Sequence, residues 1–574
     1  MPLKRFLPVI AVTLLIVVAA LWLAFGEGSR KPYMVAAANP YASDAGAAIL
    51  AQGGSAVDAA IAVQAVLTLV EPESSGLAGG AFMMHWSPGD KKLDAYDGRE
   101  TAPAGATPDM FLGDDRKPLG IIPAILSGRS VGAPGVVAML ALAHKEHGKL
   151  PWAKLFEPAI KLAEDGFAVS PKLATAIARD PALATMPTVQ DYFFTKDAEG
   201  KRIPLATGAV LKNRPLAETM KAIAAEGPDG FYKGAVAQAI VDTVNHAPSM
   251  PGSLSLADLA NYQAKHRDPL CRAYREYKVC AMPPPTSGGI ATLQILGILE
   301  NFDMGQIEPM SLVAVHFIAE AEKLAYADRG KFLGDPDFVH VPVDALLDAT
   351  YLRKRAALID PSYSMKIAKP GDLGDKRADA QGANVSVAYP STSHFAIVDS
   401  TGDVVSMTTS VEAPFGSHLM AAGMILNNQL TDFSFLPVDD GKPVANAVAP
   451  GKRPMSAMDP IIVFGKDGDF FAALGSPGGS RIIGYVTQSL IAVLDWRMTM
   501  QQAFDLPRFL DRNGPLEIEQ DTTLEKLAPQ LKQLGHDVKP EKMNSGLHGI
   551  RVTAKGLDGG ADPRREGKVV EGVR

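Results

Sequence analysis

The pattern of apolar and polar positions predicts helices and strands over most of the chain. Two helical patterns, "NPYASDAGAAILAQGG" and "SAVDAAIAVQAVLTLVEP", end at Gly-Gly and Pro72, which are stop signals. Residues 78–103 alternate on both sides of Pro88-Gly89-Asp90, which is typical of a β-hairpin. Helices are expected to dominate from about 131 to 301, and residues 313–336 form a helical run closed by Gly-Asp-Pro. The pattern therefore indicates a chain that mixes helices and strands.

A second β-hairpin is predicted where two β-rich runs, 394–399 and 403–411, flank a loop of three residues. The loop, Ser400-Thr401-Gly402, ends in a glycine that can take the left-handed conformation and form a bulge. This loop places Thr392 opposite Ser410, whereas a two-residue loop would move Ser410 to the other face of the sheet. The hairpin therefore predicts two hydroxyl groups side by side on one face.

The segment 361–390 precedes this hairpin, and we expect an exposed, mobile linker because it is polar and has no apolar period. A hydroxyl is a weak nucleophile until a base takes its proton, and the α-amine of the same residue can do so once the chain is cut before it. The Thr392 hydroxyl could attack the Ser391 carbonyl and form an ester, which water would then split. The alternative is that Thr392 and Ser410 form an ordinary cross-strand pair.

Residues 6–25 carry no charge and follow Lys4 and Arg5, and their number matches the length of a membrane-spanning helix. Cleavable signals have apolar centres of only about 7–15 residues, and the small-residue site Ala24-Phe25-Gly26 is weak. We therefore expect residues 1–30 to form an uncleaved membrane anchor. The alternative is a secreted or periplasmic protein from which the segment is removed. Basic residues on both sides leave the orientation open.

The composition argues against a nucleic-acid partner and leaves open whether the two cysteines form a disulfide. The net charge of −7, without a long block of Lys or Arg, offers nothing to neutralise a phosphate backbone, so no nucleic-acid partner is expected. With 574 residues, 47% of them hydrophobic, the chain can bury a large core as one domain or two fused lobes. Cys271 and Cys280 lie in two short predicted strands around a turn, where a disulfide and two buried thiols are both compatible with the sequence.

Two patterns resemble functional motifs but lack the context that these motifs need. Residues 128–132 read "GRSVG", but residues 121–127 do not form the clear strand that a nucleophile elbow at Ser130 requires. His316 and Glu320 lie four residues apart on one helix face, where we expect a polar helix surface rather than a metal site. No spacing of Cys or His is typical of zinc, so no metal is expected.

Several longer motifs occur together. They are "NPYASDAGAAILAQGGSAVDAAIAV", "EPESSGLAGGAF", "DGRETAP", "MPPPTSGG", "AEAEKLAYADR", "TSHFAIVD", "LNNQLTDF", "KRPMSAM" and "GSPGGSRI". In this order and spacing, from about residue 33 to the C-terminal tail, they resemble the γ-glutamyltransferase (γ-glutamyltranspeptidase, glutathione hydrolase) family. The resemblance implies an N-terminal-nucleophile hydrolase, an α+β protein folded as a four-layer αββα sandwich. It also implies a precursor that cuts itself between Ser391 and Thr392 into a large subunit, 31–391, and a small catalytic subunit, 392–574, on the outer side of the membrane.

The resemblance assigns the catalytic roles to a few of these positions. Thr392 matches the nucleophile, and its α-amine matches the general base. Ser410 stands where the family usually has a second Thr that hydrogen-bonds the nucleophile. Gly478 and Gly479 match the pair whose backbone N–H groups stabilise the oxyanion, a role that needs close approach of the backbone. No cofactor is implied.

The resemblance also assigns the residues that recognise the donor. Arg99 matches the residue that binds the α-carboxylate of the γ-glutamyl group, since a guanidinium can bond a carboxylate through two N–H groups, and Ser456 resembles its helper. Gln429 and Asp432 match positions that bind the α-amino group. The implied donor is glutathione or another γ-glutamyl compound, and the acceptor is water, an amino acid or a peptide.

Four departures from the family pattern bear on the donor. Ala457 replaces the second Ser of a usual Ser-Ser pair, which removes a hydrogen bond to a charged group worth about 1.5–3 kcal/mol. Glu412 stands where well-known members have Asn, and it could pair with an ammonium or repel an acidic acyl group. Thr431 replaces the first of two acids. Residues 434–444 are shorter than the aromatic lid loop of some members and contain no Tyr, which predicts a more open pocket.

These departures keep three functions open. The first is a self-processing γ-glutamyltransferase and glutathione hydrolase that forms a γ-glutamyl ester on Thr392. The second is a related amidase of the same fold, with a glutaryl-type or poly-γ-glutamate donor. The third is a membrane-anchored binding relative that no longer processes itself, and the joint presence of Thr392, Ser410, Gly478 and Gly479 argues against it.

Overall fold

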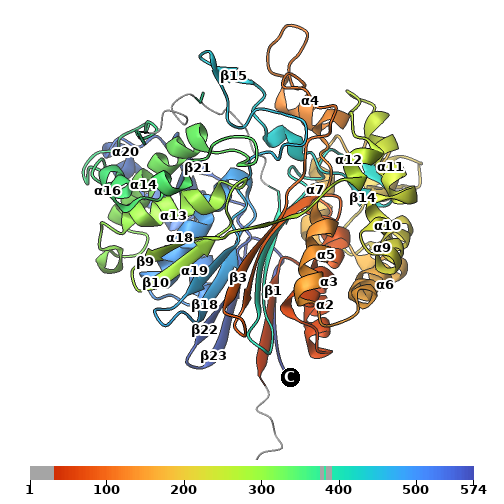
Figure 1. Ribbon diagram of the computed structural model, residues 1–574, viewed down its shortest axis with the longest axis horizontal. Helices are drawn as coiled ribbons and strands as arrows, with labels where there is room; N and C mark the ends of the chain where they lie inside the picture. The colour runs from red at the N-terminus through yellow and green to blue at the C-terminus, as the bar shows by residue number, and fades with distance from the viewer. Residues whose placement is uncertain (1–30, 375–380, 383–390) are drawn as a thin grey trace, which may run out of the picture.

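Two antiparallel β-sheets lie face to face at the centre of the molecule, with helices on their outer sides (Figure 1). The computed structural model describes residues 31–374, 381–382 and 391–574. The larger sheet has seven strands, in the order β24 (Lys568–Val573), β1 (Pro32–Ala37), β11 (Ser393–Val398), β12 (Val404–Ser410), β2 (Gly80–Ser87), β3 (Lys92–Gly98) and β8 (Lys265–Arg267). The smaller sheet has six, in the order β23 (Gly556–Ala561), β22 (His548–Thr553), β18 (Phe470–Gly475), β17 (Ile461–Phe464), β10 (Tyr277–Ala281) and β9 (Leu270–Tyr274).

Helices cover the outer faces of both sheets (Figure 1). The helices α2 (Pro40–Ala51), α3 (Ala56–Val70) and α5 (Val136–His147) pack against the seven-stranded sheet. On the other side, α13 (Gly288–Leu299) and α18 (Ile482–Leu494) pack against the six-stranded sheet, and α14 (Leu312–Phe332) packs on α13. Further helices surround these, among them α6 (Glu157–Asp165), α7 (Pro171–Arg179), α9 (Arg214–Glu226), α11 (Gly234–Asn245), α16 (Ala349–Ala356) and α19 (Met500–Asp505).

Alternate residues of the seven-stranded sheet face two different apolar cores. On β1, Met34 and Ala36 belong to the core that includes the six-stranded sheet and its helices. Val35 and Ala37 belong to the core that includes α2 and α3. Because successive side chains of a strand point to opposite faces, both faces of this sheet are buried. The α+β prediction is confirmed, and the layers run helix, sheet, sheet, helix.

The helix boundaries follow the stop signals in the sequence. α2 ends two residues before Gly53-Gly54, α3 two residues before Pro72, and α14 two residues before Gly334. At its start, α3 has a capping box, in which the Ser55 hydroxyl accepts from the Asp58 N–H and the Asp58 carboxylate accepts from the Ser55 N–H. These bonds satisfy N–H groups that the helix itself cannot pair. The predicted helices are therefore confirmed here.

The register of the central hairpin confirms the three-residue loop. β11 and β12 pair antiparallel, with Ser393 opposite Thr409. The loop closes at Gly402, whose φ of 90° lies in the left-handed region that favours glycine. Continued by one residue, this register places Thr392 opposite Ser410, as the sequence predicted.

The question about the cysteines is decided by the structure. Cys271 of β9 lies directly opposite Cys280 of β10, and the two form a disulfide. Of the two arrangements that the sequence allowed, the cross-linked hairpin is the one present.

Helix α14 corrects one prediction. His316 and Glu320 do not lie on a polar helix surface, because both side chains are buried. His316 Nδ1 lies 2.8 Å from His536 Nε2, and Glu320 accepts a hydrogen bond of 2.8 Å from Lys323 Nζ. A segment from near the C-terminus therefore covers this face of the helix.

The "GRSVG" motif has the wrong surroundings for a nucleophile elbow, as expected. A helix, α4 (Ile121–Ile125), precedes it instead of a strand. The Ser130 hydroxyl donates to the backbone carbonyls of Ile125 and Ser127, at 2.9 and 2.8 Å.

The predicted linker and anchor are only partly within the described residues. Residues 361–374 contain no helix or strand and are mostly exposed, as predicted for the linker. Its residues 375–380 and 383–390, and the predicted anchor 6–25, lie outside the described residues. In the part of the chain that the structure describes, no helix combines the length and apolar character of a membrane span.

Candidate active site

Most of the predicted site residues line one small pocket beside the central hairpin. β11 begins directly after Thr392 and β12 ends at Ser410, so both hydroxyls lie at the same end of the seven-stranded sheet. The pocket encloses about 20 Å³, which is room for about one water molecule. Its lining residues are Arg329, Ser391, Thr392, Ser410, Glu412, Gln429, Asp432, Met455, Ser456, Ala457, Met458, Gly479 and Ile482. Of the predicted site residues, Arg99 and Gly478 are not among them.

Thr392 is held next to the peptide group that it is predicted to attack. Its side chain hydroxyl lies against the backbone carbonyl of Ser391 and 3.1 Å from Ser410 Oγ. The φ of Thr392 is 154°, which few residues other than glycine adopt, and such backbone strain is concentrated at functional sites. Ser410 Oγ also accepts a hydrogen bond of 2.9 Å from the Glu412 N–H, which fixes its orientation.

The backbone around Thr392 is anchored from two sides. The Ser391 hydroxyl donates to the backbone carbonyl of Glu73, in the loop after α3. The Thr392 carbonyl accepts a hydrogen bond of 3.1 Å from Arg565 Nη1, which comes from the C-terminal tail. Segments far apart in the sequence therefore hold the Ser391–Thr392 peptide in place.

Gly478 and Gly479 form the turn between β18 and α18. Their φ values of 139° and 59° both lie in the region that favours glycine. A Cβ atom on Gly478 would come within 2.8 Å of the Tyr485 ring. The turn brings Gly479 to the pocket wall near the N-terminal end of α18, where backbone N–H groups point outward and favour negative charge. This arrangement suits an oxyanion-binding role.

Gln429 and Asp432 lie on one short helical turn, η5 (Gln429–Asp432). Gln429 Oε1 has no hydrogen-bond partner among the described residues and is free to accept one. Asp432 Oδ2 lies 2.5 Å from Arg99 Nη2. Burial raises the pKa of Asp432, against the opposing effect of the Arg99 and Arg329 guanidinium groups. The two side chains can offer acceptors to an ammonium group.

Arg99 lies behind this turn rather than in the pocket wall. Its side chain is fully buried, and it donates to Asp432 and to the backbone carbonyls of Pro454 and Met455. The guanidinium in the pocket wall is that of Arg329, from the last turn of α14, whose Nε donates to Ser287 Oγ at 2.8 Å. The sequence analysis missed Arg329, although it ends the motif "AEAEKLAYADR".

Ser456 and Ala457 line the side of the pocket near the segment that precedes α13. The backbone carbonyl of Ser456 accepts from the Ser287 N–H at 2.8 Å and from the Ser287 hydroxyl. The Ser456 hydroxyl accepts from the Met458 N–H at 3.1 Å. Ala457 offers only a methyl group here, so this wall has one side-chain hydroxyl instead of two.

Glu412 also lines the pocket. Its Oε2 accepts a hydrogen bond of 2.6 Å from Asn428 Nδ2. Its φ of 83° is a second strained value beside the candidate nucleophile. The carboxylate is held in place by its own neighbours and is part of the pocket wall.

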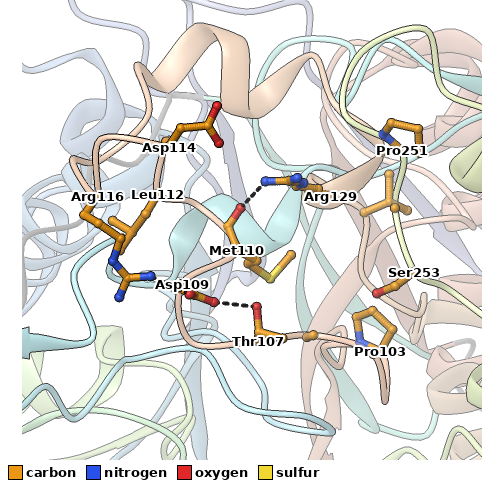
Figure 2. A pocket seen from close by; sticks show the side chains of 16 residues that line it. Pro103, Thr107, Asp109, Met110, Leu112, Asp114, Arg116, Arg129, Pro251 and Ser253 are labelled. Carbon is orange, nitrogen blue, oxygen red and sulfur yellow. Dashed lines mark hydrogen bonds and ion pairs between the residues drawn. The ribbon is translucent and has the colours of Figure 1, made fainter.

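Figure 2 shows a larger cavity, of about 420 Å³, between the loop that carries Met110 and the segment around Pro251. Arg129 donates to the Met110 carbonyl at 2.9 Å, and Thr107 donates to Asp109 at 2.8 Å. None of the predicted catalytic or donor-binding residues lines this cavity. The small pocket at Thr392 is therefore the candidate active site.

The fold and the sequence are similar to those of known hydrolases and acylases. The crystal structure of cephalosporin acylase from Bacillus halodurans superposes with a TM-score of 0.80 at 29% identity, over 94% of this chain and 96% of that chain. Among the relatives are a glutathione hydrolase proenzyme of Bacillus subtilis (strain 168), 36% identical over 94% of this chain and 91% of that protein, and the acylase ACY 1 proenzyme of Pseudomonas sp. (strain SE83), 36% identical over 95% and 94%. These similarities define an α+β protein of the hydrolase and transferase class.

The sequence matches the family described as gamma-glutamyltranspeptidase over residues 42–572. The chain belongs to this family. The resemblance drawn from the motifs is confirmed.

Proposed function

We propose that the protein is a self-processing γ-glutamyltransferase and glutathione hydrolase whose nucleophile is Thr392. The observation that carries this proposal is the position of the Thr392 hydroxyl, against the Ser391 carbonyl and 3.1 Å from Ser410 Oγ. The relative from Bacillus subtilis, a glutathione hydrolase proenzyme, supports both the activity and the processing.

In the processing step, the Thr392 oxygen attacks the Ser391 carbonyl carbon, and the proton of the hydroxyl moves to the Thr392 nitrogen as the C–N bond breaks. Water then splits the resulting ester. The products are a carboxylate at Ser391 and a free α-amine at Thr392. Ser391 lines a pocket that has room for about one water molecule, so its departure would make space for a donor.

In the catalytic cycle, the α-amine of Thr392 takes the proton from its own hydroxyl, and the oxygen attacks the γ-carbonyl of the donor. The N–H groups of Gly478 and Gly479 stabilise the oxyanion. The leaving amine takes the proton from the α-amine, and water or an amino acid then accepts the γ-glutamyl group from the ester.

The donor's α-amino group would be bound by Gln429, Asp432 and Glu412, which offer acceptors and negative charge. Its α-carboxylate would be bound by Ser456 and by the two guanidinium groups next to Asp432, those of Arg99 and Arg329. In the uncut chain Arg99 is paired with Asp432, so the carboxylate and Asp432 would share it.

The test is to purify the full chain beside Thr392→Ala and to record intact masses and N-terminal sequences. We expect two fragments from the parent, the smaller beginning Thr-Ser-His, and one uncut chain from the variant. Thr401→Ala, in the loop of the same hairpin, is the matched control and should cut like the parent. A parent chain that folds and stays intact would overturn the proposal and favour a binding relative.

A related amidase is the second candidate, and Ala457 favours it because the pocket lacks one hydroxyl toward an α-carboxylate. The acylase ACY 1 proenzyme and the cephalosporin acylase structure are relatives of this kind. The test compares kcat/KM for γ-glutamyl-p-nitroanilide with kcat/KM for glutaryl-p-nitroanilide, which lacks the α-amino group. A γ-glutamyltransferase should strongly prefer the first donor. Similar values for the two donors would favour the amidase.

We also propose that the body of the protein works outside the cytoplasm, with residues 1–30 as an anchor or a signal. The disulfide between Cys271 and Cys280 supports this location, because disulfides persist in oxidising compartments. Cell fractionation with N-terminal sequencing tests it. Recovery of the protein in the cytoplasmic fraction with both thiols free would contradict it.

A further inference from the structure

A group of histidine and carboxylate side chains lies on the seven-stranded sheet, away from the candidate nucleophile. On β2, Gly80 pairs with Ser410 at the end near the pocket, whereas His85 lies toward the other end and directly opposite Asp94 of β3. Helix α5 covers this face of the strands, and its last residue is His147. Three separate elements therefore bring His85, Asp94 and His147 together.

We propose that His85, Asp94 and His147 form a binding site for a divalent first-row transition-metal ion, with Zn²⁺ as the reference ion. One potential ligand atom from each residue lies within 4.8 Å of the others. His147 Nε2 lies 3.4 Å from Asp94 Oδ2. Two ligands on a tetrahedral zinc ion with bonds of about 2.0–2.2 Å are separated by a similar distance. Imidazole and carboxylate together suit zinc, cobalt or nickel better than calcium or magnesium.

His85 is the observation that points to a ligand. Its side chain is fully buried, and neither ring nitrogen has a hydrogen-bond partner among the described residues. A buried polar group without a partner is costly and needs a physical reason. A metal ion would provide a partner for one of the two ring nitrogens.

Asp94 is oriented for this role by groups on its other oxygen. Oδ1 accepts hydrogen bonds from His266 Nε2 at 2.6 Å and from Lys92 Nζ at 2.8 Å. Oδ2 is left facing His147 without a hydrogen bond. Neighbours that hold one carboxylate oxygen in this way commonly orient the other oxygen toward a metal. His266 and Lys92 would thus be outer partners of the ion, and the charge of Lys92 would moderate its affinity.

The remaining coordination position has two protein candidates and an entry path. The Tyr96 hydroxyl lies 2.8 Å from His147 Nε2, and Glu146 Oε2 lies 3.7 Å from the same atom. The His147 side chain is 15% exposed, so an ion can enter beside it. The His85 and His147 rings lie 3.9 Å apart at 33°, so both histidines border the same space.

The second histidine cluster does not share these properties. His316 and His536 bond each other at 2.8 Å, and Lys323 supplies a cation 2.8 Å from Glu320. Its polar groups are thus already paired with one another. A metal ion is not needed there.

The test is isothermal titration of Zn²⁺ into the chelator-stripped full chain, with Co²⁺ absorption as a report on coordination geometry. We expect one equivalent of Zn²⁺ bound and a Co²⁺ spectrum of a tetrahedral site. His147→Gln and Asp94→Asn should each weaken binding by about 10–100-fold or more, since each replaces a proposed ligand with a neutral amide that binds these ions less well. His246→Gln is the matched control, because His246 is also a histidine at a helix C-terminus but has no such cluster.

Thermal unfolding without metal shows whether each variant folds, and the partly exposed His147 is the safer site for substitution. Zn²⁺ should raise the Tm of the parent and of His246→Gln but not that of His147→Gln. The proposal is overturned if the parent binds no stoichiometric Zn²⁺. It is also overturned if folded His147→Gln and Asp94→Asn bind it as tightly as the parent.

Discussion

Two residues that line the candidate active site, Thr392 and Glu412, have positive φ angles that residues other than glycine rarely adopt. Each such residue costs about 1–3 kcal/mol and persists only when its surroundings hold it in place. Here Ser410 bonds both of them, through the Thr392 hydroxyl and the Glu412 N–H. The Ser410 hydroxyl therefore connects the two strained residues.

Ser410→Ala should slow both processing and turnover. The change removes the hydrogen bond to Thr392 and leaves the Glu412 N–H without its acceptor, at a cost of about 1–3 kcal/mol or roughly 5–150-fold in rate. Time courses of cleavage by denaturing electrophoresis measure the effect. Ser410→Thr keeps the hydroxyl and should cut at close to the parent rate. Equal rates for the parent and Ser410→Ala would show that the hydroxyl has no such role.

Arg329→Gln should weaken the binding of a γ-glutamyl donor. If the guanidinium bonds the α-carboxylate, its loss costs about 1.5–3 kcal/mol, or roughly 10–150-fold in kcat/KM. We expect most of the loss in KM, measured with γ-glutamyl-p-nitroanilide on the processed protein. Lys331→Gln, two residues away on α14, should change neither constant. An unchanged KM in Arg329→Gln would remove this residue from donor binding.

The buried carboxyl group of Glu100 should make the stability of the folded protein depend on pH. Burial raises its pKa to about 8, although Arg99 opposes the shift. In the unfolded chain its pKa is about 4.3, so unfolding releases a proton between these values and stability falls as pH rises from about 4.3 to 8. Glu100→Gln removes this contribution. Its Tm relative to the parent should increase from pH 5 to pH 8.

The background for this measurement is the uncut Thr392→Ala chain. Glu199→Gln, an exposed carboxylate, is the control and should show no such trend. A Tm difference for Glu100→Gln that stays constant with pH would contradict the shifted pKa.

At the scale of the element, the central hairpin depends on the conformation of its loop. Gly402 has a φ of 90°, and a side chain there costs about 1–2 kcal/mol. Gly402→Ala should therefore lower the free energy of unfolding by that amount in the Thr392→Ala background, as measured by denaturant titration. Gly89→Ala, in the loop of the neighbouring hairpin, lies outside the left-handed region and should be nearly neutral. A loss at Gly89 as large as that at Gly402 would contradict the argument.

The sequence could predict those helices and strands whose ends and pairing are determined by nearby residues. The register that joins Thr392 to Ser410 follows from the alternation of two strands and one glycine, all within a short segment. The ends of α2 and α3 follow from Gly-Gly and Pro72. These features depend on neighbouring residues, so one sequence is enough to find them.

Other features depend on residues far away in the chain and could not be predicted in this way. The burial of His316 depends on His536, 220 residues later. The place of Arg329 in the pocket wall depends on how α14 packs on α13. Charged and polar residues on a helix are predicted to be exposed unless the segment that covers them is known. For this reason the prediction of a polar helix surface at His316 and Glu320 was wrong.

At the scale of the molecule, the proposed cut would divide a sheet whose strands alternate between the two products. β1, from the large product, lies between β24 and β11 of the small one, and β12 of the small product pairs with β2 of the large one. Neither product therefore has a complete seven-stranded sheet. The two would stay together without any covalent link.

Refolding should distinguish the cut protein from the uncut one. After denaturation and dilution, Thr392→Ala should regain its circular dichroism at a rate that does not depend on concentration. The processed protein should recover less, and its recovery should depend on concentration, since two chains must meet. Equal and concentration-independent recovery would show that each product folds by itself.

The interleaved order of β24, β1 and β11 has a consequence for how long the mature protein lasts. A precursor that unfolds can return along the path by which it first folded, so its survival depends on an equilibrium. After the proposed cut, the two products would drift apart once they unfold, and that path would be closed. The lifetime of the cut protein would then be set by the rate at which its shared sheet opens, rather than by a free energy of folding.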